Sequence, residues 1–323
     1  MIIERVAEIS AGDGGCSVAI GTFDGVHLGH RRLLELCVAD ARRHGRESVV
    51  LTFDPHPLQV LRPVAAPRLL MTPDDRAAHI AALGIDRLVM LAFTPALANE
   101  PPTEFVRRHL GERLQAKRVF VGFNFTFGRD GAGTPERLRA LGRRWGFTVE
   151  VLPAVVCDGR PVSSSAIREA VMAGEMAQAA AMLSRPYYLP GVVVHGDGRG
   201  RTLGFPTANV AVPDALVRPR AGVYAVRLSY GEETAFGVAN IGQRPTFHGS
   251  DTRLEVHLLD CNLDLYDRPV RVHFLRYLRS ERAFASAADL QEQIAADIRA
   301  ARALKEFASP TCGGLQATAT MVE

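Results

Sequence analysis

A strand, a glycine-bearing turn and a helix follow one another near the N-terminus of the chain. Val18–Ile20 is an apolar run, Gly21–His30 holds three glycines, two histidines and one aspartate, and Arg31–Arg43 has a helical pattern. This unit is typical of α/β proteins, in which N–H groups at the start of the helix bind phosphate. His27 and His30 are three residues apart, so one helical turn brings them to the same side.

Strand-like and helix-like runs alternate over residues 1–185. The strand candidates are short and largely apolar: Ser17–Ile20, Ser48–Phe53, Leu88–Phe93, Arg118–Val121 and Thr148–Leu152. The helical patterns between them are Arg31–Arg43, Asp74–Leu83, Pro102–Leu114 and Pro135–Trp145. This order predicts an α/β, Rossmann-like domain: a parallel sheet covered on both faces, with its ligand at the carboxyl ends of the strands. One more helix is expected from Ser165 through Met182, before Arg185-Pro186.

The pattern changes from Tyr188 onward. The strand candidates, separated by Gly, Pro and Asp turns, are Gly191–His195, Val223–Leu228, Ala235–Asn240, Arg253–Leu259 and Val270–Leu275. Short alternating strands at this spacing predict a small antiparallel β-barrel domain over residues 186–308. Ser286 is expected to cap a closing helix, whose apolar stripe (Leu290, Ile294, Ile298 and Ala301) packs into the core. The small and polar residues 309–323 predict a disordered tail.

Composition excludes several classes of protein. The chain of 323 residues has a net charge of only +3 and no basic stretch interleaved with aromatics, so we expect no nucleic-acid partner. Its five cysteines form no CxxC pair, which argues against a disulfide framework or a zinc site. Neither a signal-peptide pattern nor an apolar run of ~20 residues is present. We therefore expect a cytoplasmic protein that does not bind membranes.

The histidine pair has three possible uses on spacing alone. It could ligate a metal ion with Asp24, although no further ligand cluster accompanies it. It could serve packing or helix capping. It could also donate hydrogen bonds to the charge that develops on a transferring nucleotidyl phosphate. The flanking glycines and the position after the first strand favour this third use.

Four motifs in order indicate a family. Gly21–His30 resembles the GxFDGxHxGH form of the HxGH signature of adenylyl- and cytidylyltransferases. Phe53–Pro57, Val121–Gly128 and Ser163–Arg168 resemble three motifs of the flavin-adenylylating branch. From about residue 15 to 305, the chain resembles the prokaryotic bifunctional riboflavin kinase/FAD synthetase.

The Ser163–Arg168 motif also has a physical interpretation of its own. Consecutive hydroxyls before a helix make good N-caps. A basic residue in the first turn opposes the helix dipole unless an anion is present, so Arg168 suggests a triphosphate clamp, as the resemblance also implies. Ser165 stands where the family usually has Thr, and the hydroxyl is retained.

The resemblance implies further roles in the first domain. Catalysis falls to His27, His30 and Arg168, and nucleotide binding to Gly21, Phe23, Asp24, Gly29, Ser163, Ser164 and Ser165. It implies that His56, Asn124 and Phe125 bind flavin. Without the resemblance, a loop histidine is often merely solvated. The period-two series Phe123, Phe125 and Phe127 equally suits a strand edge buried in the core, with Asn124 on its opposite side.

The second domain carries a candidate phosphate site. Gly196, Arg199 and Gly200 belong to a glycine- and arginine-rich loop, which could surround phosphate or form a flexible hairpin turn. Pro206–Asn209 matches the PTAN signature of riboflavin kinases, which implies that Thr207 and Asn209 hold Mg²⁺ and nucleotide phosphates.

Glu255 lies on a predicted strand, opposite its apolar face, where a surface glutamate is usual. The resemblance assigns it as the base that accepts the hydroxyl proton of the substrate. Asp267 departs from the family, in which Gly commonly follows the tyrosine, here Tyr266.

Together these observations predict a bifunctional enzyme of flavin cofactor biosynthesis that uses ATP and Mg²⁺, with riboflavin, FMN and FAD as substrates and products. A weak homo-oligomer is compatible with the sequence. Two alternatives remain open. One is a single-activity enzyme, FAD synthetase or riboflavin kinase, whose other domain only binds flavin. The other is a flavin carrier or sensor without catalysis, which would not need two phosphate sites.

Overall fold

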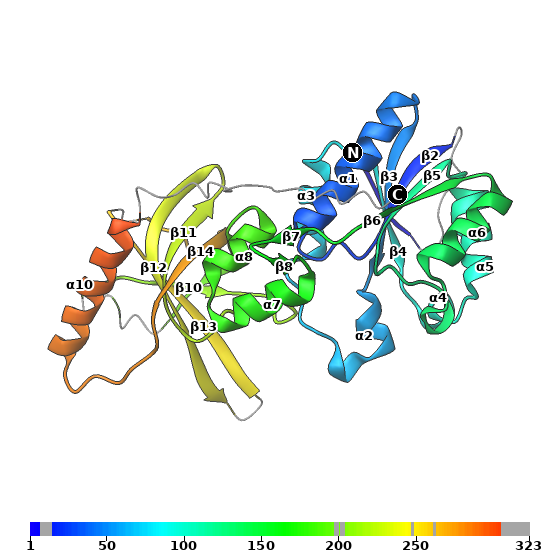
Figure 1. Cartoon of the computed structure of the whole chain (residues 1–323). Coiled ribbons are helices and arrows are strands. Elements are labelled where there is room, and N and C mark those ends of the chain that lie inside the picture. The colour runs from blue at the N-terminus through cyan, green and yellow to red at the C-terminus, as the bar shows by residue number, and fades with distance from the viewer. Residues whose placement is uncertain (7–14, 197–199, 201–203, 247–248, 261–262, 305–323) are drawn as a thin grey trace. The chain divides into compact units, whose positions relative to one another are not determined.

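The computed structural model describes residues 1–6, 15–196, 200, 204–246, 249–260 and 263–304 (Figure 1). The chain packs into two compact units, Met1–Ser164 and Ser165–Glu323. The domain boundary predicted at residue 185 stays a prediction. In the described ranges, no helix has the length and apolar character needed to cross a membrane.

A six-stranded parallel sheet forms the first unit, in the order β1-β4-β3-β2-β5-β6. Its strands are β1 (Ile2–Val6), β2 (Cys16–Ile20), β3 (Glu47–Asp54), β4 (Arg87–Ala92), β5 (Arg118–Gly122) and β6 (Thr148–Leu152). This confirms the predicted parallel sheet and its five strands. The edge strand β1 was not predicted, because it is short and its exposed Ile2 and Ile3 are followed by the charged Glu4 and Arg5.

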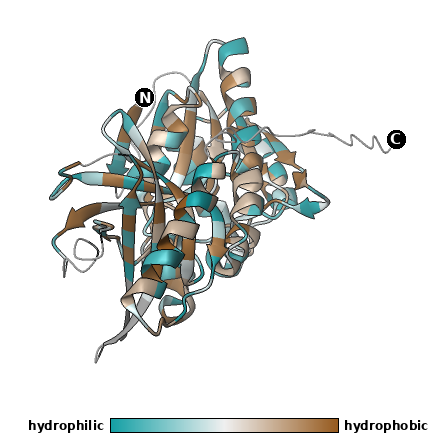
Figure 2. Ribbon diagram, turned by 90° about the vertical axis from the view of Figure 1, so that its left-hand side faces the viewer, coloured by the Kyte–Doolittle hydropathy of each residue, from teal (hydrophilic) through white to brown (hydrophobic). Residues whose placement is uncertain are grey.

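Helices cover both faces of this sheet. On one face, α1 (Leu28–Arg43) and α3 (Pro73–Ala81) pack on strand residues such as Ala19, Val50 and Leu88. On the other, α5 (Pro102–Phe105), η2 (Val106–Arg113) and α6 (Pro135–Trp145) pack on Val18, Leu51 and Val121. Neighbouring strand residues thus enter different cores, while the helices carry both hydrophilic and hydrophobic residues (Figure 2).

The helix expected over Pro102–Leu114 is confirmed, but only its first part, α5, is α-helical. The segment continues from α5 as a π-helix, in which the N–H of Leu114 donates to the carbonyl of His109 at 3.0 Å. The remaining short elements of this unit are α2 (Pro57–Leu61), η1 (Pro63–Ala65), α4 (Pro95–Ala98), η3 (Arg129–Gly131), β7 (Val156–Cys157) and β8 (Arg160–Pro161).

Two helices replace the single helix expected from Ser165 through Met182. They are α7 (Ser164–Ala173) and α8 (Met176–Leu183). Gly174 separates them with a φ of +82°, a left-handed conformation that suits glycine and ends a helix. Helix α8 packs against β9 (Tyr187–Val194) and β14 (Pro269–Arg279) of the second unit.

The predicted antiparallel barrel is confirmed. It closes in the order β10-β13-β12-β11-β14-β9, and its other strands are β10 (Ala208–Ala211), β11 (Gly222–Tyr230), β12 (Glu233–Thr246) and β13 (Gly249–Leu258). Strand β10 was missed because it is short and begins inside the PTAN motif. Ser286 caps α10 (Ala287–Ala303) as expected, and Ile298 and Ala301 pack on the barrel. The predicted disordered tail, 309–323, lies outside the described residues.

Candidate active sites

The turn after β2 holds a strained backbone. Phe23 and Val26 have φ values of 51° and 39°, and the N–H of Val26 donates to the carbonyl of Phe23 at 3.1 Å. Positive φ is unfavourable for such side chains, for β-branched valine above all. Both side chains are buried, so the core holds the turn in this shape. Strain of this kind concentrates at ligand sites.

His27 begins α1 as its N-cap. Its Nδ1 accepts a hydrogen bond from the backbone N–H of His30 at 3.2 Å, and the two rings stack with centroids 3.6 Å apart. A Cβ at Gly29 would lie 3.2 Å from the His27 ring, so glycine makes room for it. The capping use of the histidine pair is therefore confirmed for His27. With Nδ1 acting as the acceptor, a neutral His27 ring would carry its proton on Nε2.

His30 is partly exposed as a residue, but its Nδ1 is buried and has no hydrogen-bond partner among the described residues. Burial lowers the pKa of His30 well below its usual value, and the nearby His27 and Arg76 lower it further. His30 is therefore neutral at pH 7. A neutral ring donates through one N–H and accepts through its other nitrogen.

Asp24 has a structural role. Both oxygens of its buried carboxylate accept a hydrogen bond from the backbone N–H of Leu70, at 3.0 and 3.1 Å. The Ser164 hydroxyl donates to the Asp24 carbonyl at 2.8 Å, across 140 residues of sequence. Phe23 is buried too, with its ring 3.2 Å from where a Cβ of Gly21 would lie. The nucleotide roles predicted for these residues stay predictions.

Arg76 belongs to this region and was missed in the sequence. It is buried, and its guanidinium donates to the carbonyls of Thr22 (2.9 Å) and Phe53 (3.1 Å), which fixes the chain beyond β2 to the end of β3. Its Nε is buried and has no partner in the described part of the chain. An arginine in an amphipathic helix pattern usually lies at the surface, so the pattern around Arg76 carries no signal of its burial.

His56 follows directly on β3. It is buried and caps α2: its Nδ1 accepts from the N–H of Leu58 at 3.2 Å, while the Gln59 side chain accepts from the His56 N–H at 3.1 Å. Capping α2 is therefore a structural role of His56 that was not predicted from the sequence. Its predicted flavin contact stays a prediction.

The strand edge that the phenylalanine spacing allowed as one alternative over Val121–Gly128 is wrong beyond Gly122. The chain turns there, with the N–H of Phe125 bonded to the Gly122 carbonyl at 3.1 Å, and Phe127 pairs with Gly133 instead of the sheet. Phe127 is buried, Phe125 is partly buried against it, and Phe123 is exposed. Asn124 is exposed in the turn, where its side chain is accessible to a ligand.

The sheet brings three of the predicted segments to one edge. Strands β3, β2 and β5 are parallel neighbours in that order. His56 follows β3, Gly21–His30 follows β2, and the Asn124-Phe125 pair follows β5. The carboxyl ends of these strands form one edge, where ligands of such folds bind. Ser163 and Ser164 end the first unit. The exposed Ser165 and the buried Arg168 belong to the second, so the role of Arg168 stays a prediction.

In the barrel, three neighbouring strands align polar side chains. Glu255 of β13 lies directly opposite Asn209 of β10 on one side and Asn240 of β12 on the other. Residues that face each other across strands share one side of the sheet. Asn240 donates to Glu281 at 3.1 Å, and its Oδ1 is buried with no partner among the described residues. No role was predicted for Asn240 from the sequence.

Arg253 connects two members of this row, and it too was missed. Its Nε and Nη2 donate to Oδ1 of Asn209 at 3.0 and 2.8 Å, and its Nε lies 2.5 Å from Oε1 of Glu255. Arg253 and Glu255 are two residues apart on β13 and therefore share a face. Alternation marked this face as polar in the sequence, but it could not distinguish a site from a solvated surface.

Two glycines lie against the PTAN segment. A Cβ at Gly196 would be 2.1 Å from Nδ2 of Asn209, and one at Gly200 would be 2.4 Å from the Phe205 carbonyl oxygen and 3.0 Å from Oγ1 of Thr207. Backbone therefore approaches both predicted metal ligands, as a loop around phosphate requires. Arg199 lies outside the described residues.

The PTAN segment is also fixed from the other side, where Nδ1 of His257 lies 2.8 Å from the Pro206 carbonyl oxygen. Asp267, which stands where the family has glycine, has a φ of 58°, and aspartate tolerates this conformation better than most residues. The departure therefore leaves the turn intact.

Comparisons with known proteins agree with this arrangement. A model of the FAD synthetase family matches residues 9–166, and a model of the riboflavin kinase family matches residues 183–305. A crystal structure from Streptococcus pneumoniae, described as a macrolide-efflux protein, matches with a TM-score of 0.86 at 32% identity, over 94% of this chain and 99% of that one.

Curated relatives match over most of their length. The protein from Escherichia coli is 39% identical over 289 residues, which is 89% of this chain and 92% of the relative. That from Pseudomonas fluorescens is 42% identical over 291 residues (90% and 93%), and that from Bacillus subtilis 36% over 285 residues (87% and 89%). All three are described as bifunctional riboflavin kinase/FMN adenylyltransferase, and this chain belongs to that family.

Proposed function

We propose that this chain makes FAD from riboflavin in two ATP-dependent steps. The barrel transfers the γ-phosphate of ATP to the 5′-hydroxyl of riboflavin, giving FMN. The parallel-sheet domain lets the FMN phosphate attack the α-phosphate of a second ATP, giving FAD and pyrophosphate. The observation that carries the proposal is the row of Asn209, Glu255 and Asn240 beside two closely packed glycines.

In the kinase step, Glu255 accepts the hydroxyl proton as the riboflavin oxygen attacks. The oxygens of Thr207 and Asn209 are hard ligands that suit Mg²⁺, and the glycine loop approaches both, so these residues fit the metal. Bound Mg²⁺ neutralises phosphate charge in such reactions. The unpartnered Oδ1 of Asn240 is an acceptor that could orient the flavin hydroxyl. Positioning and charge neutralisation supply most of the rate.

In the adenylyl-transfer step the nucleophile is already an anion, so no strong base is needed. His27 donates through Nε2, because its Nδ1 is used as the helix cap. His30 acts as a neutral ring, since its pKa is lowered by burial. Together with Arg168 they stabilise the transferring group and the pyrophosphate that leaves.

The proposal extends to the setting of the enzyme. We expect it to act in the cytoplasm with riboflavin, FMN, FAD and ATP as its partners, without nucleic acid, and at most as a weak homo-oligomer.

One incubation tests the function. Purified full-length protein is mixed with riboflavin, ATP and Mg²⁺, and the flavins are separated by chromatography. FMN followed by FAD is the expected result. FMN without FAD, or FAD formed only when FMN is supplied, means that one domain merely binds flavin. No conversion of riboflavin and none of supplied FMN means that the protein is a carrier or sensor.

A further inference from the structure

The Oδ1 atom of Asn209 is already engaged within the barrel. Two N–H groups of the Arg253 guanidinium converge on it, at 3.0 and 2.8 Å. An amide oxygen has two lone pairs, and both point to donors when two such hydrogen bonds form. The Nδ2 side of the same amide faces Gly196, where a Cβ would lie 2.1 Å away. The amide therefore has little room to turn its oxygen elsewhere.

We propose that Arg253 competes with Mg²⁺ for Oδ1 of Asn209 and thereby sets how much Mg²⁺ the kinase site requires. The inference rests on the proposed role of Asn209 as a metal ligand. A guanidinium and a divalent cation cannot share one small oxygen at bonding distance, because both bring positive charge to it. Metal binding must therefore displace the two N–H groups, and their loss weakens the apparent affinity for Mg²⁺.

Glu255 gives the displaced guanidinium a partner. Its Oε1 lies 2.5 Å from Nε of Arg253, and both side chains are about 30% exposed, at 28% and 29%. Arg253 can therefore leave Asn209 while its charge stays paired on the same strand. This makes the exchange reversible and local to β13 and β10.

The test replaces Arg253 in the full-length enzyme. Arg253→Gln should lower the Mg²⁺ concentration for half-maximal FMN formation by roughly three- to tenfold, the effect of one or two ordinary hydrogen bonds. The Mg²⁺ dependence of FAD formation from supplied FMN should not change, and it serves as an internal reference. Mn²⁺ binding in the presence of ADP, followed by electron paramagnetic resonance, should tighten by a similar factor without any turnover.

Three further variants separate competition from other causes. Arg253→Lys keeps the charge but lacks the planar fork, so it should keep most of the gain in Mg²⁺ affinity. Arg253→Gln in a Glu255→Gln background should also keep the gain in Mn²⁺ affinity. In this background no carboxylate is released that could act as a new metal ligand, so the gain must come from Asn209. Arg271→Gln removes one charge from the exposed face of β14 and should change nothing.

Each contrary result has a defined meaning. An Arg253→Lys enzyme that behaves like wild type attributes the effect to charge alone and overturns the competition. So does a gain that disappears in the Glu255→Gln background, or an Arg253→Gln enzyme that binds Mn²⁺ no more tightly than wild type. Asn209→Ala should weaken Mn²⁺ binding. If it does not, the ligand role of Asn209 is wrong, whatever Arg253 does.

Discussion

His27 and His30 are joined through the helix they begin. Nδ1 of His27 accepts the backbone N–H of His30 at 3.2 Å, and the two rings stack 3.6 Å apart with an angle of 14° between their planes. Two positively charged rings at this separation would repel each other strongly, because little water lies between them to screen the charges. At most one of the two histidines is therefore expected to be protonated at a time. The neutral ring of His30 thus lies in the first turn of a helix, where the helix dipole also favours a phosphate group.

Replacing His30 tests this arrangement. His30→Ala should lower FAD formation from FMN by about 10²-fold, the usual effect of losing a donor to the transition state. FMN formation from riboflavin should stay close to that of wild type, because the barrel carries that step. Both rates are measured on the same protein. His44→Ala, a histidine at the other end of α1, is the matched control and should spare both activities. Equal loss of both activities in His30→Ala would contradict the assignment of two sites.

The lowered pKa of His30 predicts how folding stability depends on pH. Above about pH 6.5 the ring is neutral in both the folded and the unfolded chain, so it contributes no slope. Below that value the unfolded chain binds a proton that the folded chain refuses, so stability falls as pH falls, by up to about 1.4 kcal/mol per pH unit. His30→Asn should remove this part of the slope between pH 6.5 and 5, as measured by urea unfolding. Identical slopes in the two proteins would show that His30 titrates normally in the folded state.

The regular parts of the fold were predictable because their patterns are local. Each predicted strand of the sheet matches an observed one to within two residues, since buried parallel strands are short apolar runs. The π-helical turn at Val106–Arg113 and the helix break at Gly174 were not predictable in this way. Both depend on how one segment packs on another, such as Gly111 under the ring of Trp145.

The candidate sites were predictable only as lists of motif residues. Arg76 and Arg253 were missed, because each stands in an ordinary amphipathic pattern and becomes special only through what it contacts. Arg76 binds two carbonyls 54 and 23 residues away, and Arg253 binds an amide 44 residues away. Sequence spacing carries no information about such partners. By contrast, Asn209 and Glu255 were found through motifs, and the barrel register then placed them opposite each other.

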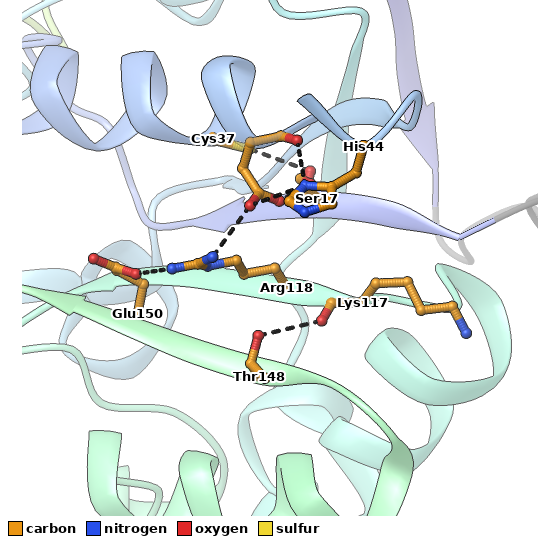
Figure 3. Close-up of polar contacts among 8 residues, drawn as sticks. Ser17, Cys37, His44, Lys117, Arg118, Thr148 and Glu150 are labelled. Carbon is orange, nitrogen blue, oxygen red and sulfur yellow. Dashed lines mark hydrogen bonds and ion pairs between the residues drawn. The ribbon is translucent and has the colours of Figure 1, made fainter. Parts of the chain in front are cut away.

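A polar cluster supports the opposite end of the sheet. Asp40 of α1 accepts hydrogen bonds from Ser17 at 2.6 Å and from Arg118 at 3.2 Å. Arg118 also contacts Glu150, as Figure 3 shows. The Asp40 side chain is 7% exposed. Ser17 and Arg118 lie at the amino ends of β2 and β5, away from the edge with the candidate site.

Asp40→Ala should therefore reduce the free energy of unfolding by about 2 kcal/mol, because it leaves the buried Ser17 hydroxyl without its acceptor and removes one of the two carboxylates that pair with Arg118. The catalytic rates of the folded protein should not change. Asp74→Ala breaks an ion pair with Arg5 in which the aspartate is 88% exposed, and should change stability by less than about 1 kcal/mol. Chemical denaturation measures both. Similar losses in the two variants would mean that burial of Asp40 adds nothing.

The cysteines of the first unit should differ in reactivity. Burial raises the pKa of Cys16 to about 12, and it raises the pKa of Cys37 as well, so neither forms thiolate near pH 8. Their thiols donate to the carbonyls of Leu114 and Ser17. Cys157 is partly exposed and should react with iodoacetamide at least about tenfold faster. Peptide-level mass spectrometry resolves the three sites, and rapid labelling of native Cys16 or Cys37 would contradict their burial.

Glu255→Gln should separate the two activities in the opposite sense to His30→Ala. The amide keeps the shape of the side chain but cannot accept the proton of the riboflavin hydroxyl, so FMN formation should fall by about 10²-fold or more. FAD formation from supplied FMN should be retained. Glu233→Gln changes a carboxylate on β12 that accepts a hydrogen bond from the Tyr230 hydroxyl, and it should leave both rates unchanged. If Glu255→Gln raised the KM for riboflavin without lowering kcat, Glu255 would bind the substrate rather than act as its base.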